Sequence, residues 1–387
     1  MKRAREHAAK TRYFALGLSS VCQGISCYER IPSHPLLSFT CHWLCQCRGT
    51  IELCRHPRLR VGLMLALVLL IGSSCAEAQT DRAVTSIKSA REKLRPLHQK
   101  MGPPQPGDWL GSHPEQGQTF EQYLAAQPVT PTGRRRTIYL LPLGDFTEKQ
   151  QEVIKLTGEY LGLCYNRPVK SLAPFPLAKV PQAAQRVRPG AAAAPPPPEA
   201  ESPVPPSVIP ETLEAPAPNP EDIQILTTWL LDDLLPKRLP EDGAALIALT
   251  ASDLWPGPGW NFVFGQASLQ KRVGVWSINR NGNPARNEED FRLCLRRTLK
   301  TAGHELGHMF TIQHCTAYEC GMCGSNNRGE ADRRPLAFCP ECTAKICWAT
   351  QADPRTHLSK LAEFCQKHGL EEDAKFYQDS AAALSRK

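Results

Sequence analysis

Three histidines in one short stretch constrain this chain more than any other feature of its 387 residues. His304 and His308 lie four residues apart, so on a helix both imidazoles share one face. His314 follows six residues after His308, far enough for the chain to leave the helix and return with a third ligand. Three imidazoles around zinc leave the fourth position open, as in catalytic rather than structural sites. The stretch therefore predicts a catalytic zinc centre.

Glu305 supplies the remaining group that hydrolysis requires. Zinc lowers the pKa of a bound water from ~15.7 to about 7 and polarises a carbonyl oxygen. Glu305, beside the histidines, can accept the proton of that water and pass it to a leaving amine. A histidine pair with this spacing also occurs on ordinary solvated helices. The third histidine and the cysteines that follow favour the catalytic interpretation, which is hydrolysis of peptide bonds.

Two cysteine pairs follow the histidines and predict a second metal site. Cys315 and Cys320 are separated by four residues, and Cys339 and Cys342 by two. Four thiolates with such spacing can hold a closed, structural zinc ion. A single pair can also be a surface pair or a redox motif, but two pairs beside three histidines favour metal, and we expect two zinc ions per chain. The spacing leaves open whether either of two further thiols replaces one of the four: Cys323 and Cys347.

The stretch resembles the signature of the archaemetzincin (archaelysin) family, HExxHxxGxxHC-x4-C-x-M, then a spacer, then CxxC. The matching residues are His304, Glu305, His308, His314, Cys315, Cys320, Met322, Cys339 and Cys342. The resemblance implies that the histidines bind catalytic zinc and that the glutamate is the general base. It also implies that the methionine forms the floor of the site and that the cysteines bind structural zinc. It extends from about residue 90 to the end of the sequence.

Two positions depart from the family pattern. Thr311 stands where the family has glycine, and sixteen residues separate Met322 from Cys339 where we expect seventeen. Glycine tolerates a positive φ, whereas a β-branched threonine is strained there. Either the turn is built differently, or Thr311 carries strain of about 1–3 kcal/mol. The approach of His314 to the site depends on which alternative holds.

The apolar pattern predicts an α/β fold, a small twisted mixed sheet backed by helices, with the histidine helix crossing beneath the cleft and the cysteine site beside it. Strands are expected at 137–143, 169–172 and 244–249, and as an antiparallel pair at 260–267 and 273–278. Helices are expected at 147–163, capped by Asp145, and at 221–235, 287–311, 343–350, 357–368 and 371–384. Cys294 is expected to be a core thiol, and His357 and His368 to be solvated.

In metzincins, which the family resembles, an edge strand above the active-site helix pairs with extended substrate. The segment 262–267 is our candidate for that strand, with Phe262, Phe264 and Gly265 as substrate-binding residues. Peptide would bind by adding a strand through main-chain hydrogen bonds. The alternative is an ordinary buried hairpin.

Composition divides the chain into unequal parts. Residues 1–60 hold six of the sixteen cysteines and are expected to be a leader absent from the mature protein. Residues 80–135 are expected to form an N-terminal arm without chemistry of its own, in which Asp108 and His113 are surface residues. Residues 136–387 are expected to form the catalytic domain, and the Pro/Ala-rich segment 174–220 a disordered insertion.

Charge and the apolar run near the N-terminus bear on partners and compartment. Residues 1–60 carry ten Lys or Arg against three Asp or Glu, which is seven of the eight net positive charges, so nucleic acid is not an expected partner. Residues 61–79 have the form of a secretory signal and are too short for a comfortable membrane span. Export is predicted, with a cytoplasmic location as the alternative because zinc thiolates suit a reducing compartment. We expect a monomer acting on peptides or proteins.

A zinc-stabilised peptide-binding module with little or no turnover is the alternative function. Thr311 favours it, because a misplaced His314 would spoil the open site. Glu305 argues against it, since a module that only binds has no use for a general base.

Overall fold

The main sheet is built around two long parallel strands. The computed structural model describes residues 81–189 and 222–386. Contacts group residues from Arg82 onward into one unit, and the description that follows concerns that unit. The sheet has five strands in the order β2-β1-β5-β8-β7. Their bounds are Thr137–Leu143 (β1), Val169–Ser171 (β2), Gly243–Thr250 (β5), Gly265–Ala267 (β7) and Val273–Ser277 (β8). All neighbouring pairs are parallel except β7 and β8, which are antiparallel.

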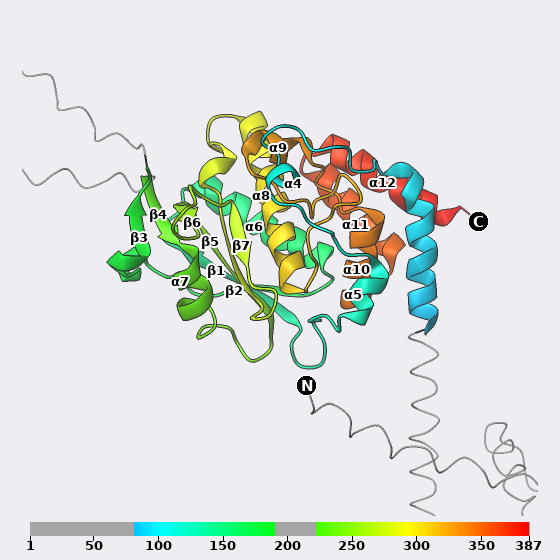
Figure 1. Ribbon diagram of the computed structural model, residues 1–387, viewed down its shortest axis with the longest axis horizontal. Coiled ribbons are helices and arrows are strands. Elements are labelled where there is room, and N and C mark those ends of the chain that lie inside the picture. Colours follow the sequence, from blue (N-terminus) through cyan, green and yellow to red (C-terminus); the bar gives the residue numbers. More distant parts are fainter. Residues whose placement is uncertain (1–80, 190–221, 387) are drawn as a thin grey trace, which may run out of the picture. The chain divides into compact units, whose positions relative to one another are not determined.

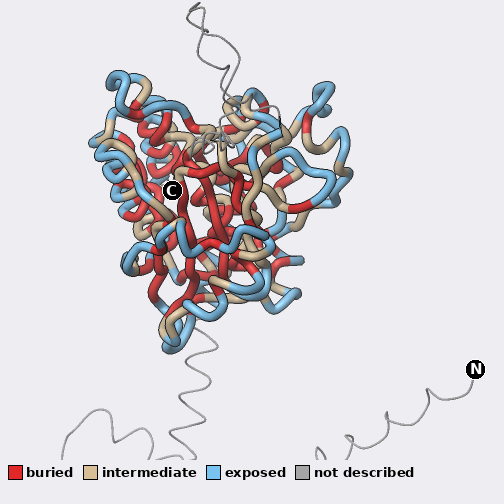
Figure 2. The backbone as a smooth tube through the Cα atoms, turned by 90° about the vertical axis from the view of Figure 1, so that its left-hand side faces the viewer, coloured by how far each residue is buried: buried red, intermediate tan, exposed pale blue. Residues whose placement is uncertain are grey.

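Alternate residues of the central strands face two different layers. In β5, Ile247 and Leu249 belong to the core that contains helices α6 (Glu148–Cys164) and α8 (Glu288–Met309). Leu246 and Ala248 belong to a second core on the opposite face. All eight residues of β5 are buried, and burial of one such Leu or Ile contributes about 1.5–3 kcal/mol. Figure 2 shows buried segments at the centre and exposed segments around them. The predicted α/β fold with a mixed sheet is confirmed.

A second sheet covers the face opposite α6 and α8. It has three strands in the order β3-β4-β6, with bounds Gln185–Val187, Ile223–Leu226 and Asp253–Trp255. The predicted helix at 221–235 is therefore wrong in its first part, and helical structure begins only with α7 (Thr227–Trp229) and the π-helical turn η5 (Leu230–Leu234). The reason is tertiary. Gln224 is fully buried and its amide donates to Asp253 and to Asn261 O, contacts that an extended chain provides.

The first part of the predicted insertion is ordered. Phe175 N donates to Pro142 O at 2.8 Å, and Gly144 N donates to Phe175 O at 2.9 Å. The segment therefore runs alongside the end of β1. Phe175, Val180 and Ala184 are buried in the second core, which a proline-rich composition does not reveal. Short 3-10 turns occupy Leu177–Lys179 (η2) and Gln182–Ala184 (η3). Residues 190–221, with the rest of the predicted insertion, lie outside the described residues, as do the leader and the signal-like segment 61–79.

Most other predicted elements are present with small changes. Thr147 rather than Asp145 caps α6, because its side chain and that of Gln150 form a reciprocal capping box. The antiparallel strand pair is confirmed, although β7 is shorter than predicted. A 3-10 turn, η6 (Asn279–Asn281), follows β8. Cys294 is a core thiol, fully buried as predicted.

The C-terminal third is helical, with α9 (Arg328–Arg333), α10 (Pro340–Thr350), α11 (Pro354–Lys367) and α12 (Glu371–Ser385). The prediction that His357 is solvated is wrong, since only 3% of the residue is exposed and burial lowers its pKa to about 4. His368 is half-buried and packs on Phe364, with ring centroids 4.6 Å apart. No described helix is both long enough and apolar enough to cross a membrane.

The N-terminal arm packs along the side of the unit that carries the histidines. Residues 81–94 are helical, followed by η1 (Arg95–Leu97), α4 (Trp109–Ser112) and α5 (Phe120–Ala125). Figure 1 shows the arm, blue to cyan, running from the α12 side past α9 and α4 to α5, which lies beside α10. Backbone hydrogen bonds join it to the segment after α8, including Met101 N to Ala317 O at 3.1 Å.

Candidate metal centres

Helix α8 carries the first two histidines. Asn287 caps its N-terminus by accepting from Asp290 N, as the predicted start requires, and three acidic residues fill the first turn. The apolar face buries Phe291, Leu295 and Leu299 in the core, so the opposite side of the helix, which carries the histidines, faces away from these residues. His304 and His308 face each other, with their Nε2 atoms 2.9 Å apart. The helix therefore presents two imidazoles to one point.

Thr311 ends this helix in the conformation that the family glycine would adopt. Its φ is +66°. Thr311 N donates to His308 O at 2.9 Å and Ile312 N to Gly307 O at 3.0 Å, the paired bonds of a Schellman motif. Of the two alternatives posed by the sequence, the structure shows the strained one, with a threonine at φ > 0. Thr311 Oγ1 accepts from Val129 N of the arm at 3.0 Å, which helps to hold the turn.

The third histidine reaches the same point as the first two. The ligand atoms of His304, His308 and His314 all lie within 4.8 Å of one another. Each Nδ1 has an acceptor: Gly321 O at 3.0 Å for His304, Ile312 O at 2.7 Å for His308, and Glu115 Oε1 at 2.9 Å for His314. Acceptors on Nδ1 fix the tautomer whose Nε2 lone pair is free for a metal. Burial lowers the pKa of His304, and lowers that of His308 to about 3. Both imidazoles are therefore neutral at neutral pH, which is the form that binds a metal.

Glu305 lies beside the histidines, almost fully buried at 5% exposure. Burial raises the pKa of its carboxyl to about 8, and a cation held by the neighbouring histidines would favour the ionised form. The carboxylate faces the edge strand, since a Cβ placed on Gly265 would lie 2.6 Å from Glu305 Oε1. Gly265 leaves the space that Glu305 occupies.

The other two predicted substrate residues are placed differently. Phe262 and Phe264 precede β7 and carry arginine side chains on their rings. Arg280 Cζ lies 3.6 Å from the Phe262 centroid and Arg328 Cζ 4.0 Å from the Phe264 centroid. Among the three candidates only Gly265 is shown to meet Glu305.

Met322 is fully buried against α8. A Cβ on Gly307, between the two helix histidines, would lie 2.6 Å from Met322 Sδ. The methionine thus packs against the part of the helix that carries the histidines.

The four predicted cysteines form a second group of ligand atoms within 4.8 Å of one another. The Sγ atoms of Cys315 and Cys339 are 3.6 Å apart, well beyond the ~2.05 Å of a disulfide, and the cysteines are free. Cys320 Sγ accepts from Met322 N at 3.4 Å and from Cys339 N at 3.1 Å. Cys339 caps α10 and accepts from Cys342 N, so two thiols lie at the positive end of a helix.

This donor set fits zinc. Burial raises the pKa of the Cys320 and Cys339 thiols, and a bound cation would displace their protons. Four sulfur ligands with backbone N–H partners are typical of a closed zinc site, and three imidazoles of an open one. The group does not include the two further thiols. Cys323 Sγ donates to Tyr318 O at 3.3 Å, and Cys347 is buried in a separate apolar cluster.

Sequence reasoning missed the contribution of the N-terminal arm. Glu115 contacts His314 across 199 residues of sequence. Asp108, predicted to be a surface residue, is 5% exposed and pairs with Arg333 at 2.5 Å, and His113 stacks on Trp109 with centroids 3.9 Å apart. No local pattern marks Glu115 and Asp108, because their partners come from distant segments.

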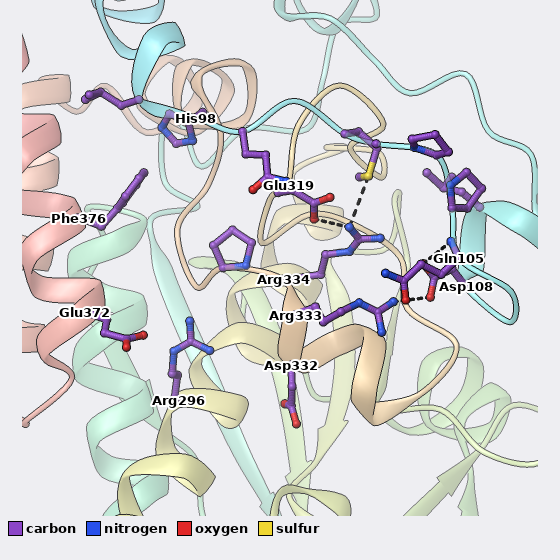
Figure 3. Close-up of a pocket in the computed structure, with 18 residues that line it drawn as sticks. His98, Gln105, Asp108, Arg296, Glu319, Asp332, Arg333, Arg334, Glu372 and Phe376 are labelled. Atoms are coloured by element: carbon purple, nitrogen blue, oxygen red, sulfur yellow. Dashed lines mark hydrogen bonds and ion pairs between the residues drawn. The ribbon is translucent and has the colours of Figure 1, made fainter.

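A cavity of about 720 Å³ lies where the arm meets α8, α12 and the loop after α9. Figure 3 shows Arg334 beside Glu319 and Arg333 beside Asp108 in its wall, with Arg296 and Glu372 nearby. Among the described residues, none of the seven metal-site histidines and cysteines lines it, so this cavity is not the predicted active site.

Comparisons with known proteins agree with this geometry. The model of peptidase family M54 matches residues 232–347, which include all seven predicted metal ligands. Archaemetzincin-2 from Homo sapiens is 32% identical over 289 residues, covering 66% of this chain and 72% of that protein. Archaemetzincin from Methanopyrus kandleri is 40% identical over 120 residues, covering 31% of this chain and 64% of that protein.

The crystal structure of archaemetzincin from Methanopyrus kandleri superposes with a TM-score of 0.39 and 24% identity, covering 57% of this chain and 98% of that one. The family assignment rests on the human relative, which is similar over most of its length. The chain belongs to the archaemetzincin family, peptidase family M54, and is a zinc metallopeptidase.

Proposed function

We propose that the chain hydrolyses peptide bonds at the His304–His308–His314 centre, with Glu305 as general base and a second, structural zinc at the four cysteines. The observation that carries the proposal is the meeting of three imidazoles, each with its Nδ1 bonded to an acceptor, beside a buried carboxylate. When bound there, zinc supplies a Lewis acid that polarises a carbonyl and makes water more acidic.

The chain's own residues supply binding and proton transfer. Extended substrate pairs with β7, which is the last strand of the main sheet and is paired with β8 on one side only. Gly265 has no side chain, so the Glu305 carboxyl can lie directly against this edge strand. A Glu305 carboxylate oxygen accepts the proton of the attacking water and returns it to the leaving amine. Burial keeps this carboxyl away from bulk water, so the proton is not lost between the two steps.

The binding module without turnover has less support. Its main argument was that Thr311 would misplace His314. Thr311 adopts the glycine-like φ of +66° and the ligand atom of His314 lies within the histidine group. Together with the buried glutamate, this favours an enzyme.

The test is a Glu305→Gln variant of the full chain assayed on a peptide library. Gln keeps the size and the position of the side chain but cannot accept a proton. We expect both zinc ions to be retained and turnover to fall about 10²–10⁴-fold, the usual contribution of a general base. Wild-type turnover by this variant would remove Glu305 from the mechanism. A wild-type chain that binds two zinc ions and cleaves no peptide would favour the binding module.

A further inference from the structure

We infer that Glu115 of the N-terminal arm is a positioning residue for His314, so that the arm is part of the histidine centre. The inference rests on the proposed function, in which His314 is a zinc ligand. It extends that proposal to a segment far outside the HExxH stretch.

Both carboxylate oxygens of Glu115 contact the same ring nitrogen of His314. Oε1 and Oε2 lie 2.9 and 3.0 Å from His314 Nδ1. The partners of His304 and His308 are main-chain carbonyls of nearby residues, which come with the local fold. His314 alone among the three depends on a side chain, and that side chain comes from a distant segment.

Trp109 fixes the carboxylate of Glu115. Its indole Nε1 donates to Glu115 Oε1 at 3.1 Å, and its ring meets that of His314 edge to face, with centroids 5.4 Å apart. Trp109 N donates to both carboxylate oxygens of the fully buried Glu330, at 3.1 and 3.0 Å. The ring lies so close to Gly324 that a Cβ there would be 2.5 Å from it. Trp109 therefore fixes Glu115 from one side.

The arm is fixed again after Glu115. Gly117, with φ +70°, lies against Thr316, and the side chain of Lys345 donates to Gln118 O. Further along, Phe120 N donates to Glu341 at 3.0 Å, and Tyr123 Oη donates to Phe310 O at 2.8 Å. Glu115 thus lies between two anchored ends, which makes its position a property of the fold.

A carboxylate on Nδ1 has two effects on a metal-binding imidazole. It fixes the ring orientation and tautomer, and it makes the free Nε2 a stronger donor. Loss of such a partner typically costs 10–100-fold in metal affinity. A surface ion pair without this role would contribute little to stability and nothing to metal affinity. Metal affinity therefore separates the two interpretations.

The experiment measures the dissociation constant of zinc at the histidine centre by chelator competition, on the full chain with the cysteine site already loaded. Glu115→Ala removes the acceptor, and we expect the constant to rise about 10–100-fold. Glu115→Gln keeps an acceptor without the charge, and we expect a smaller rise. Glu121→Gln is the matched control, since Glu121 lies on the same arm and pairs with Arg91 instead. It should bind zinc as the wild type does.

Two further measurements make the result decisive. Circular dichroism and the thermal midpoint show whether each variant keeps the fold. If Glu115→Ala does not fold, the zinc affinity of Glu115→Gln provides the test. Wild-type affinity in a folded Glu115 variant would overturn the inference. A His308→Ala chain that holds as much zinc as the wild type would instead overturn the proposed histidine centre itself, and the inference with it.

Discussion

The two metal centres are joined by consecutive residues, His314 and Cys315, yet they are built in different ways. The cysteine ligands are all buried and come from residues 315–342 alone. Their hydrogen-bond partners include main-chain N–H groups of the same segment. The histidine ligands are partly exposed and come from α8 and the turn after it, and one of them is oriented by the arm.

This difference separates a local site from an assembled one. The four ligands of the cysteine site all come from its own loop and the start of α10, and all four are buried. The histidine site must leave room for substrate. One of its hydrogen-bond partners, Glu115, comes from the distant N-terminal arm. The cysteine site also serves the histidine site, because Gly321, whose carbonyl accepts from His304, lies directly after Cys320. A filled cysteine site is expected to hold the histidine site in shape.

The largest predicted effect is removal of the local site. Replacing Cys339 and Cys342 together by Ser should unfold the C-terminal third, because structural zinc contributes about 10–16 kcal/mol in small zinc domains. Circular dichroism and limited proteolysis of the full chain measure this loss. The control is Cys347→Ser, which changes a buried thiol outside the metal group. It should lower the free energy of unfolding by about 1–3 kcal/mol and leave the zinc content of the chain unchanged. A double variant that stays folded would contradict the second zinc.

A smaller effect is expected at the assembled site from Gly265→Ala. The new Cβ would lie 2.6 Å from Glu305 Oε1 and 2.8 Å from its Cδ, so the carboxylate must move. Displacement of a catalytic group by about 1 Å can cost 10²-fold, and we expect kcat/KM to fall at least tenfold with both zinc ions retained. Gly102→Ala, where a Cβ meets nothing within 4 Å, is the control. Unchanged kcat/KM would show that Glu305 adjusts without loss.

The smallest effect is expected from Thr311→Gly in the turn that ends α8. Glycine relieves strain of about 1–3 kcal/mol at φ +66°. It also removes the bond from Val129 N, which contributes about 0.5–1.5 kcal/mol, and adds backbone entropy to the unfolded chain. These terms nearly offset, so urea denaturation should show a change below about 1 kcal/mol. A loss above about 2 kcal/mol would show that the contact between Thr311 and the arm matters more than the strain.

Features that depend on neighbouring residues could be predicted from the sequence. The spacing of His304 and His308, the cysteine pairs and the apolar run of β5 each follow from neighbours along the chain, and all were predicted. Glu115 was missed because nothing near it marks a partner 199 residues away. The apolar spacing predicts a helix over residues 223–226, where the structure has strand β4. The buried polar contacts of Gln224 that favour the extended chain are tertiary, so the local pattern does not reveal them. His357 was expected in solvent, and its burial in α11 is likewise a tertiary feature of the fold.

The most direct test of the two-centre account is zinc per chain, measured by elemental mass spectrometry on the full chain before and after dialysis against a chelator. The account predicts two zinc ions at first. It predicts one after dialysis, with the fold retained, because the open histidine site releases its ion before the buried cysteine site does. A His308→Ala chain should hold one zinc throughout. Two ions lost together with the fold, or a single ion in the wild type from the outset, would contradict the account.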